Sequence, residues 1–136
     1  MSKEFHLTVL TPYGRYFDGN VTFLNVRSEK YNLGIYAEHA PLISTVDICG
    51  IIIRTNNSEY KYAVGGGVIK IDKEKTTLIL NSIERADEID IERAKAAKQR
   101  AEERLISDRK EEIDVNRAKL ALLRALNRLE VSEKDN

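Results

Sequence analysis

The chain contains one cysteine, no tryptophan and two prolines in 136 residues, and its 22 basic side chains balance its 22 acidic ones. The single cysteine, Cys49, cannot close an intrachain disulfide, which favours a reducing cytoplasm and the interpretation of Cys49 as a small buried hydrophobe. A net charge of zero gives no overall attraction to nucleic acid or to an anionic membrane. No apolar run approaches the roughly 20 residues that span a bilayer, and no signal peptide is expected. A partner must therefore be recognised locally, and another component must hold the protein at any membrane.

Patterns typical of catalysis and of metal binding are also missing. No nucleophile with a base, no paired carboxylates and no Cys/His/carboxylate cluster at ligand spacing stand out, so we expect neither an enzyme nor a metal site. His39 is interpreted as a turn histidine. Gly65-Gly66-Gly67 lacks the phosphate-loop pattern and precedes a strand-like run, so we interpret it as a sharp bend at a sheet corner.

Glycine, proline and aromatic residues are absent from the last third of the chain. All seven glycines, both prolines and all nine aromatic residues lie at or before Gly67. The first part favours strands and turns, whereas the Ala, Glu, Lys, Arg and Leu of the tail favour helix. We therefore predict a β + α protein, with an all-β sandwich over residues 1–84 and an antiparallel helical hairpin over 85–136.

Short β-type runs alternate with turn residues in the first part. Strands are expected at 5–10, 21–27, 33–36, 42–46, 48–54, 59–64, 68–72 and 76–81, with hairpin loops at 56–58 and 72–75. This regular spacing predicts a sandwich or a barrel, but it does not predict the strand order.

The tail contains an internal repeat. Residues 88–95 recur 24 positions later as 112–119, and Arg100 and Arg104 recur as Arg124 and Arg128. We expect helices at about 90–107 and 114–129, with Asp90 and Asp114 each serving as an N-cap or as a first-turn carboxylate. The charged segment 108–112 links them.

Small apolar residues at three- or four-residue steps predict the contact, here called the seam, between the two helices. The seam residues are Ala94, Ala97, Ala101 and Leu105 on the first helix, and Val115, Ala118, Leu122, Ala125 and Leu129 on the second. An alanine-rich seam buries little apolar area, so the hairpin is expected to be marginally stable and open to control by a ligand or partner.

Three arginines on each helix fall within a stripe of roughly 40°, here called an arginine rail. The rails are Arg93, Arg100 and Arg104 on the first helix, and Arg117, Arg124 and Arg128 on the second. Arginine's planar fork suits phosphates and carboxylates, so binding of an anion is one interpretation. The alternative is a solvated face paired with acids such as Glu102, Glu103 or Glu130.

Several motifs occur in an order that resembles one family. They are Leu7-Thr8-Val9-Leu10-Thr11-Pro12, Leu33-Gly34-Ile35 with His39-Ala40-Pro41-Leu42, Val64-Gly65-Gly66-Gly67, Ile89-Asp90-Ile91-Glu92-Arg93-Ala94 and the segment 120–129. Along essentially its whole length the chain resembles the epsilon subunit of the bacterial F-type ATP synthase.

The resemblance implies a non-catalytic rotor subunit of the central stalk, held peripherally at the cytoplasmic face of the cell membrane through the complex. It implies that the sandwich binds the gamma subunit and rests on the ring of c subunits. It further implies that the tail folds down on the sandwich or extends along gamma toward the C-terminal region of the catalytic beta subunits, and toward alpha, where it inhibits ATP hydrolysis.

In some bacterial members the folded hairpin binds ATP through an Ile/Leu-Asp-x-x-Arg-Ala motif, which residues 89–94 match in full. The resemblance therefore implies ATP as a regulatory ligand, with no required cofactor. The residues that it implies are Glu84, Ile89, Asp90, Arg93, Ala94, Arg100, Arg124 and Arg128. One departure lies in residues 31–38, where the family commonly has Gly-Glu-Leu-Gly and a glycine just before the histidine.

Two alternatives stay open. A rotor subunit whose hairpin binds no nucleotide would use its arginines only for docking. A freestanding β-domain with a coiled-coil dimerisation tail is less well matched, because the seams are alanine-rich and the two helices are short.

Overall fold

The computed structural model describes residues 3–107 and 112–133 of the chain. The chain divides into two compact units, Met1–Arg85 and Ala86–Asn136. The first unit contains all the strands and the second contains all the helices that the structure describes. The strands and the helices therefore belong to separate units.

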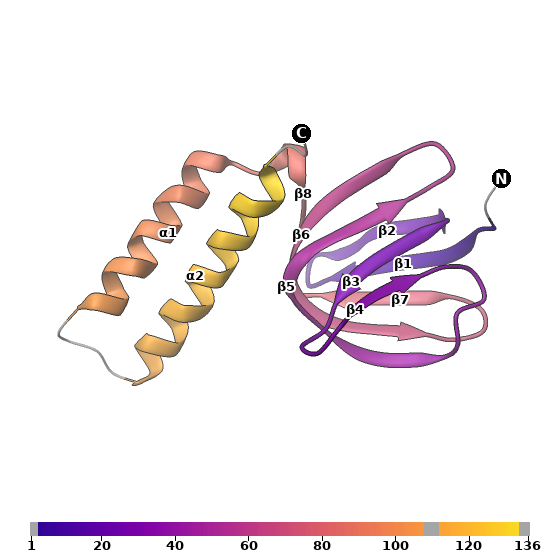
Figure 1. Ribbon diagram of the computed structural model, residues 1–136, viewed down its shortest axis with the longest axis horizontal. Helices are drawn as coiled ribbons and strands as arrows, with labels where there is room; N and C mark the ends of the chain where they lie inside the picture. The colour runs from indigo at the N-terminus through magenta and orange to yellow at the C-terminus, as the bar shows by residue number, and fades with distance from the viewer. Residues whose placement is uncertain (1–2, 108–111, 134–136) are drawn as a thin grey trace. The chain divides into compact units, whose positions relative to one another are not determined.

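The first unit is a β-sandwich, as the strand spacing predicts (Figure 1). Its strands are β1 (Phe5–Thr11), β2 (Gly14–Val21), β3 (Phe23–Arg27), β4 (Asn32–Ile35), β5 (Leu42–Arg54), β6 (Glu59–Ile71), β7 (Thr76–Leu80) and β8 (Ile83–Arg85). They form one hydrogen-bonded sheet in the order β2-β1-β7-β6-β5-β3-β4, with β8 paired to β6. The two 13-residue strands β5 and β6 pair along most of their length. The outer neighbour of β6 changes from β8 to β7, whereas β3 lies beside the C-terminal end of β5.

The sandwich core is aliphatic and fully enclosed. Leu7, Leu24, Ile35, Ile69 and Leu78, drawn from both layers, each have no exposed surface. Cys49 joins them at 1% exposure, as expected for a small buried hydrophobe, and burial raises the pKa of its thiol. This rigid scaffold holds the loops at the ends of the sandwich.

The sequence-based strands differ from the observed ones in four places. Gly14–Val21 is a strand, β2, whereas no strand was expected between residues 10 and 21. The short β8 was not expected either. The runs at 42–46 and 48–54 are one continuous strand, as are those at 59–64 and 68–72, because both strands of the β5–β6 pair continue through the middle of the ladder.

Gly65-Gly66-Gly67 lies inside β6, where the strand changes neighbours. Before it, Tyr62–Val64 pairs with β8, and from Gly67 onward β6 pairs with β7. Gly66 has a φ of 90°, a conformation that side-chain-bearing residues rarely adopt. The bend that we expected is thus a change of partner within a continuous strand.

The second unit is a two-helix hairpin preceded by a short 3-10 helix, η1 (Ala86–Glu88). Helix α1 spans Ile91–Ile106, with Asp90 as N-cap and Ser107 as C-cap, so the predicted bounds of the first helix are correct. Helix α2 spans Glu112–Ser132. It begins two residues earlier than expected, so Asp114 lies in the first turn and is not the N-cap. The linking residues 108–111 lie outside the described residues.

The seam that the sequence predicts is the contact between the helices, which run side by side (Figure 1). Ala94, Ala101, Ala118 and Ala125 have at most 3% exposure. The other five seam residues are half-buried. No helix within the described residues is long and apolar enough to cross a membrane.

Enlarging a seam alanine is expected to open the hairpin. Ala118→Leu would force three extra carbons into a position that is 1% exposed, and overpacking of this kind costs about 2 kcal/mol. We expect lower helicity by circular dichroism and a lower melting temperature of the hairpin, with no change in the unfolding of the sandwich. Ala96→Leu, at an exposed position of α1, is the control, and equal effects of the two variants would contradict the seam.

Candidate functional site

The N-terminal turn of α1 is built by the nucleotide motif that the resemblance identified. The Asp90 carboxylate accepts a hydrogen bond from the Arg93 backbone N–H at 3.0 Å, and the Asp90 carbonyl accepts one from Ala94. Ile89 and Ala94 are buried, at 8% and 3% exposure, whereas the Arg93 side chain is exposed. The motif therefore shapes the start of the helix and leaves one guanidinium in solvent.

The relative level of residues on the two helices follows from their bounds. Helix α1 ends at Ile106 and α2 begins at Glu112, so these ends are neighbours in the antiparallel pair. An α1 residue and an α2 residue therefore lie at the same height along the hairpin when their two residue numbers add up to about 218. The buried alanines agree with this register, because Ala94 with Ala125 and Ala101 with Ala118 each give a sum of 219.

Both arginine rails lie on one face of the hairpin. Viewed along either helix from its N-terminus, the rail lies anticlockwise of the seam, by about 85° on α1 and about 120° on α2. Because the helices are antiparallel, offsets of the same sense bring the two rails to the same side. We call this side the arginine face.

The structure places the expected arginines at two levels of this face. Arg124 and Arg128 lie level with residues near 94 and 90, beside Arg93 at the start of α1. Arg100 lies two turns further along, about 10 Å from Arg93 along the axis. Arg93, Arg124 and Arg128 are here called the proximal triplet.

Most of the rail is solvated, as the alternative expects, but in the part of the chain that the structure describes its exposed arginines are not ion-paired. Within the described residues, no ion pair joins a carboxylate to Arg93, Arg100, Arg104, Arg117 or Arg124. Glu103 instead accepts a hydrogen bond from Gln99 at 3.4 Å. Lys95, on the opposite side of α1 from the rail, pairs with Glu92 at 3.8 Å. The arginine face therefore carries several cations that an anion could meet.

Glu84, the remaining residue of the expected nucleotide site, lies in β8 of the first unit, where it is half-buried and opposite Ala63 of β6. Its part in nucleotide binding stays a prediction. Among the residues that the structure describes, no three His, Cys, Asp or Glu side chains gather as a metal ion would require.

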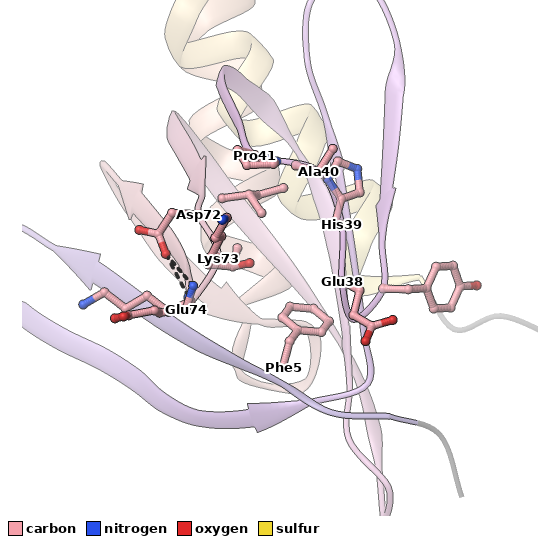
Figure 2. Close-up of a pocket in the computed structure, with 12 residues that line it drawn as sticks. Phe5, Glu38, His39, Ala40, Pro41, Asp72, Lys73 and Glu74 are labelled. Carbon is pink, nitrogen blue, oxygen red and sulfur yellow. Dashed lines mark hydrogen bonds between the residues drawn. The ribbon is translucent and has the colours of Figure 1, made fainter.

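A pocket that the sequence did not reveal lies at one end of the sandwich (Figure 2). Its volume is about 450 Å³, and it is lined by Phe5, by residues 36 and 38–41, and by residues 71–76. Asp72 accepts hydrogen bonds from the backbone N–H groups of Lys75 and Glu74, at 3.0 and 2.9 Å, and these lower the pKa of its carboxyl. Three segments far apart in the sequence form this pocket, so no local motif could have predicted it.

Glu38, at the rim of the pocket, has a φ of 66°. This left-handed conformation suits glycine, which the family resemblance leads us to expect at this position. The exposed Glu38 carboxylate pairs with Lys3 at 3.1 Å, which contributes little to stability.

Replacing Glu38 by glycine is expected to stabilise the sandwich. Glu38→Gly removes a left-handed strain of about 1–2 kcal/mol per residue, offset in part by the entropy of glycine in the unfolded chain. We expect a melting temperature a few degrees higher in calorimetry. Ala37→Gly, at a neighbouring position without positive φ, should lower it, and a fall in both variants would contradict the assignment of strain.

A β-sandwich followed by a capped, arginine-bearing helical hairpin defines a class of small two-domain chains, and each domain matches a described family. Residues 4–86 match "ATP synthase, Delta/Epsilon chain, beta-sandwich domain", and residues 87–133 match "ATP synthase, Delta/Epsilon chain, long alpha-helix domain". The chain therefore belongs to the ATP synthase delta/epsilon chain family, which confirms the resemblance seen in its motifs.

Similar proteins include ATP synthase epsilon chains of bacteria. That of Desulforamulus reducens is 39% identical over 107 residues, 79% of this chain and 81% of the relative. That of Pelotomaculum thermopropionicum is 41% identical over 103 residues, 76% of this chain and 77% of the relative.

Two solved structures share the fold at 16% sequence identity. A chain of the Euglena gracilis mitochondrial ATP synthase has a TM-score of 0.78 over 88% of this chain and 76% of that chain. A chain of the Tetrahymena thermophila mitochondrial ATP synthase central stalk has a TM-score of 0.65 over 97% of this chain and 98% of that chain.

Proposed function

We propose that this chain is a non-catalytic rotor subunit of the central stalk of a bacterial F-type ATP synthase, and that its hairpin binds ATP and thereby regulates ATP hydrolysis. Family membership supports the first part, as does the likeness to a chain from a central stalk and c-ring assembly. The observation that carries the second part is the arginine face, on which both rails of an Asp90-capped hairpin come together.

The proposed partners are the gamma subunit, the ring of c subunits and, for an extended tail, the C-terminal region of the catalytic beta subunits together with alpha. An apolar patch on the outer face of the sandwich supports a protein partner. Val68 pairs across the strands with Ile79 and with Thr45, and Ile43 lies two residues from Thr45 on the same face. Ile43 is 70% exposed and Ile79 52%. The complex would hold the chain at the cytoplasmic face of the membrane.

In the proposed nucleotide complex, the proximal triplet and Arg100 meet the phosphates through charge-assisted hydrogen bonds. Asp90 keeps the first turn of α1 closed, which presents Arg93, and Ile89 and Ala94 pack the helix start beneath it. Glu84 is assigned to the adenosine part by family likeness alone. No catalytic step is required of any of these residues.

ATP would act by favouring the folded hairpin. A ligand shifts an equilibrium only by its differential affinity for the two states, and at 100 times its Kd it stabilises the binding state by about 2.7 kcal/mol. When ATP falls, the helices would separate, and their basic faces would meet an acidic segment of the catalytic subunits.

Calorimetric titration of the whole chain with ATP tests the nucleotide part. We expect one ATP site, and a rise in the melting temperature of the hairpin when it is filled. Absence of ATP binding would leave the second candidate, a rotor subunit whose arginines serve docking alone. A dimeric mass in solution would favour the third, a coiled-coil dimerisation tail.

A further inference from the structure

The 24-residue repeat gives the hairpin an approximate twofold symmetry. The counterpart of each α1 residue is the α2 residue 24 positions later. Because the two helices are antiparallel, a rotation of about 180° about an axis through the middle of the arginine face brings each α1 residue onto its counterpart. The buried alanines obey the relation, because Ala94 and Ala101 correspond to Ala118 and Ala125, and all four have at most 3% exposure. Ala97 and Ala121, also counterparts, lie at the centre of this face, between the rails and the seam.

The same rotation carries the proximal triplet onto three other arginines. Arg93 corresponds to Arg117, and Arg124 and Arg128 correspond to Arg100 and Arg104. Arg117 lies level with a residue near 101, so Arg100, Arg104 and Arg117 gather within about 6 Å along the axis, as the proximal triplet does. We call them the distal triplet. The centres of the two triplets are about 14 Å apart along the axis.

We propose that the distal triplet is a second anion site of the hairpin, which binds a phosphate group. All three arginines are exposed, and none of them makes an ion pair within the residues that the structure describes. Three guanidinium groups held on one face repel one another, and an oxyanion between them removes the repulsion and gains charge-assisted hydrogen bonds. The proposal does not require ATP to bind the proximal triplet.

The ligand is expected to be small. The proximal site has Ile89 and Asp90 built into a capped start of α1, whereas Asp114 lies inside α2 and makes no cap. The distal triplet therefore has no capped helix start beside it, which matches inorganic phosphate or the terminal phosphate of a second nucleotide better than a whole nucleotide. Filling both triplets would stabilise the folded hairpin more than ATP does by itself, so the hairpin would respond to phosphate as well as to ATP.

The test uses the whole chain, titrated with sodium phosphate at constant ionic strength and followed by the amide NMR signals of both helices. Arg104→Gln with Arg117→Gln removes two distal cations, and Arg100 is kept because it also belongs to the proposed ATP site. We expect phosphate affinity to fall by about 10-fold or more, because charge-assisted hydrogen bonds to the anion are lost. ATP affinity should stay within about 3-fold, a difference of under 1 kcal/mol.

The control is Lys95→Gln with Lys119→Gln, another pair of repeat counterparts, which removes the same charge from the opposite sides of the helices. It should leave phosphate binding unchanged. If a second ATP binds each chain, and the Arg104/Arg117 variant loses it, the result would support the distal site and would show that a nucleotide supplies the phosphate group. Chloride giving the same effect as phosphate, or equal loss of phosphate binding in both variants, would overturn the proposal. Failure of ATP binding with phosphate binding intact would reject only the proposed ATP site.

Discussion

ATP affinity is expected to fall by about 100-fold in the Asp90→Ala/Arg93→Ala variant, a loss of about 3 kcal/mol. Loss of an N-cap costs about 1 kcal/mol, and loss of a charge-assisted hydrogen bond to a phosphate costs about 1.5–3 kcal/mol. Asp90 and Arg93 meet through the backbone of the first turn, so their effects need not add. Calorimetry measures the affinity, and the helical signal in circular dichroism shows whether the hairpin still forms.

Three single substitutions separate the contributions. Asp90→Asn keeps a good N-cap and removes the charge, so it should retain ATP binding if the carboxylate serves the helix alone. Arg93→Lys keeps the charge and loses the planar fork, so it should weaken binding. Lys95→Ala removes one positive charge from the opposite side of α1 and should leave affinity unchanged. An unchanged affinity in the double variant would reject Asp90 and Arg93 as parts of the site.

The hairpin was the most predictable part of the molecule, because its signals are local. Asp90 before a run of helix formers marks the start of α1, and alanines at three- and four-residue steps mark the seam. The start of α2 was misplaced because Glu112 and Asp114 both suit a first turn. That the two rails share one face follows once the helices are known to be antiparallel and in contact.

The sandwich was predictable as a class and not as a topology. Strands β1 and β7 pair in parallel although about 70 residues separate them, a contact that no local pattern encodes. Gly14–Val21 pairs with β1 although its Gly and Asn residues disfavour a strand, because tertiary pairing outweighs propensity. The pocket at the end of the sandwich is formed by three such distant segments, and it was missed for the same reason.

Gly67→Ala is expected to destabilise the sandwich by about 3 kcal/mol or more, the upper end of overpacking costs. A Cβ at Gly67 would collide with the backbone carbonyl oxygen and carbon of Ile79, which cannot move without disturbing the β6–β7 ladder. Glycine is thus required at this position because two backbones approach closely. The backbone conformation does not require it, since Gly67 has no positive φ.

Denaturant unfolding of the chain measures the effect on the sandwich. Gly19→Ala is the matched control, because a Cβ there would meet only the side chain of Phe17, at 3.4 Å. It should change the free energy of unfolding by less than about 1 kcal/mol. Equal stability of the two variants would mean that β6 and β7 can separate at Gly67. In that case β6 would not need its three consecutive glycines in order to change from one neighbouring strand to the next.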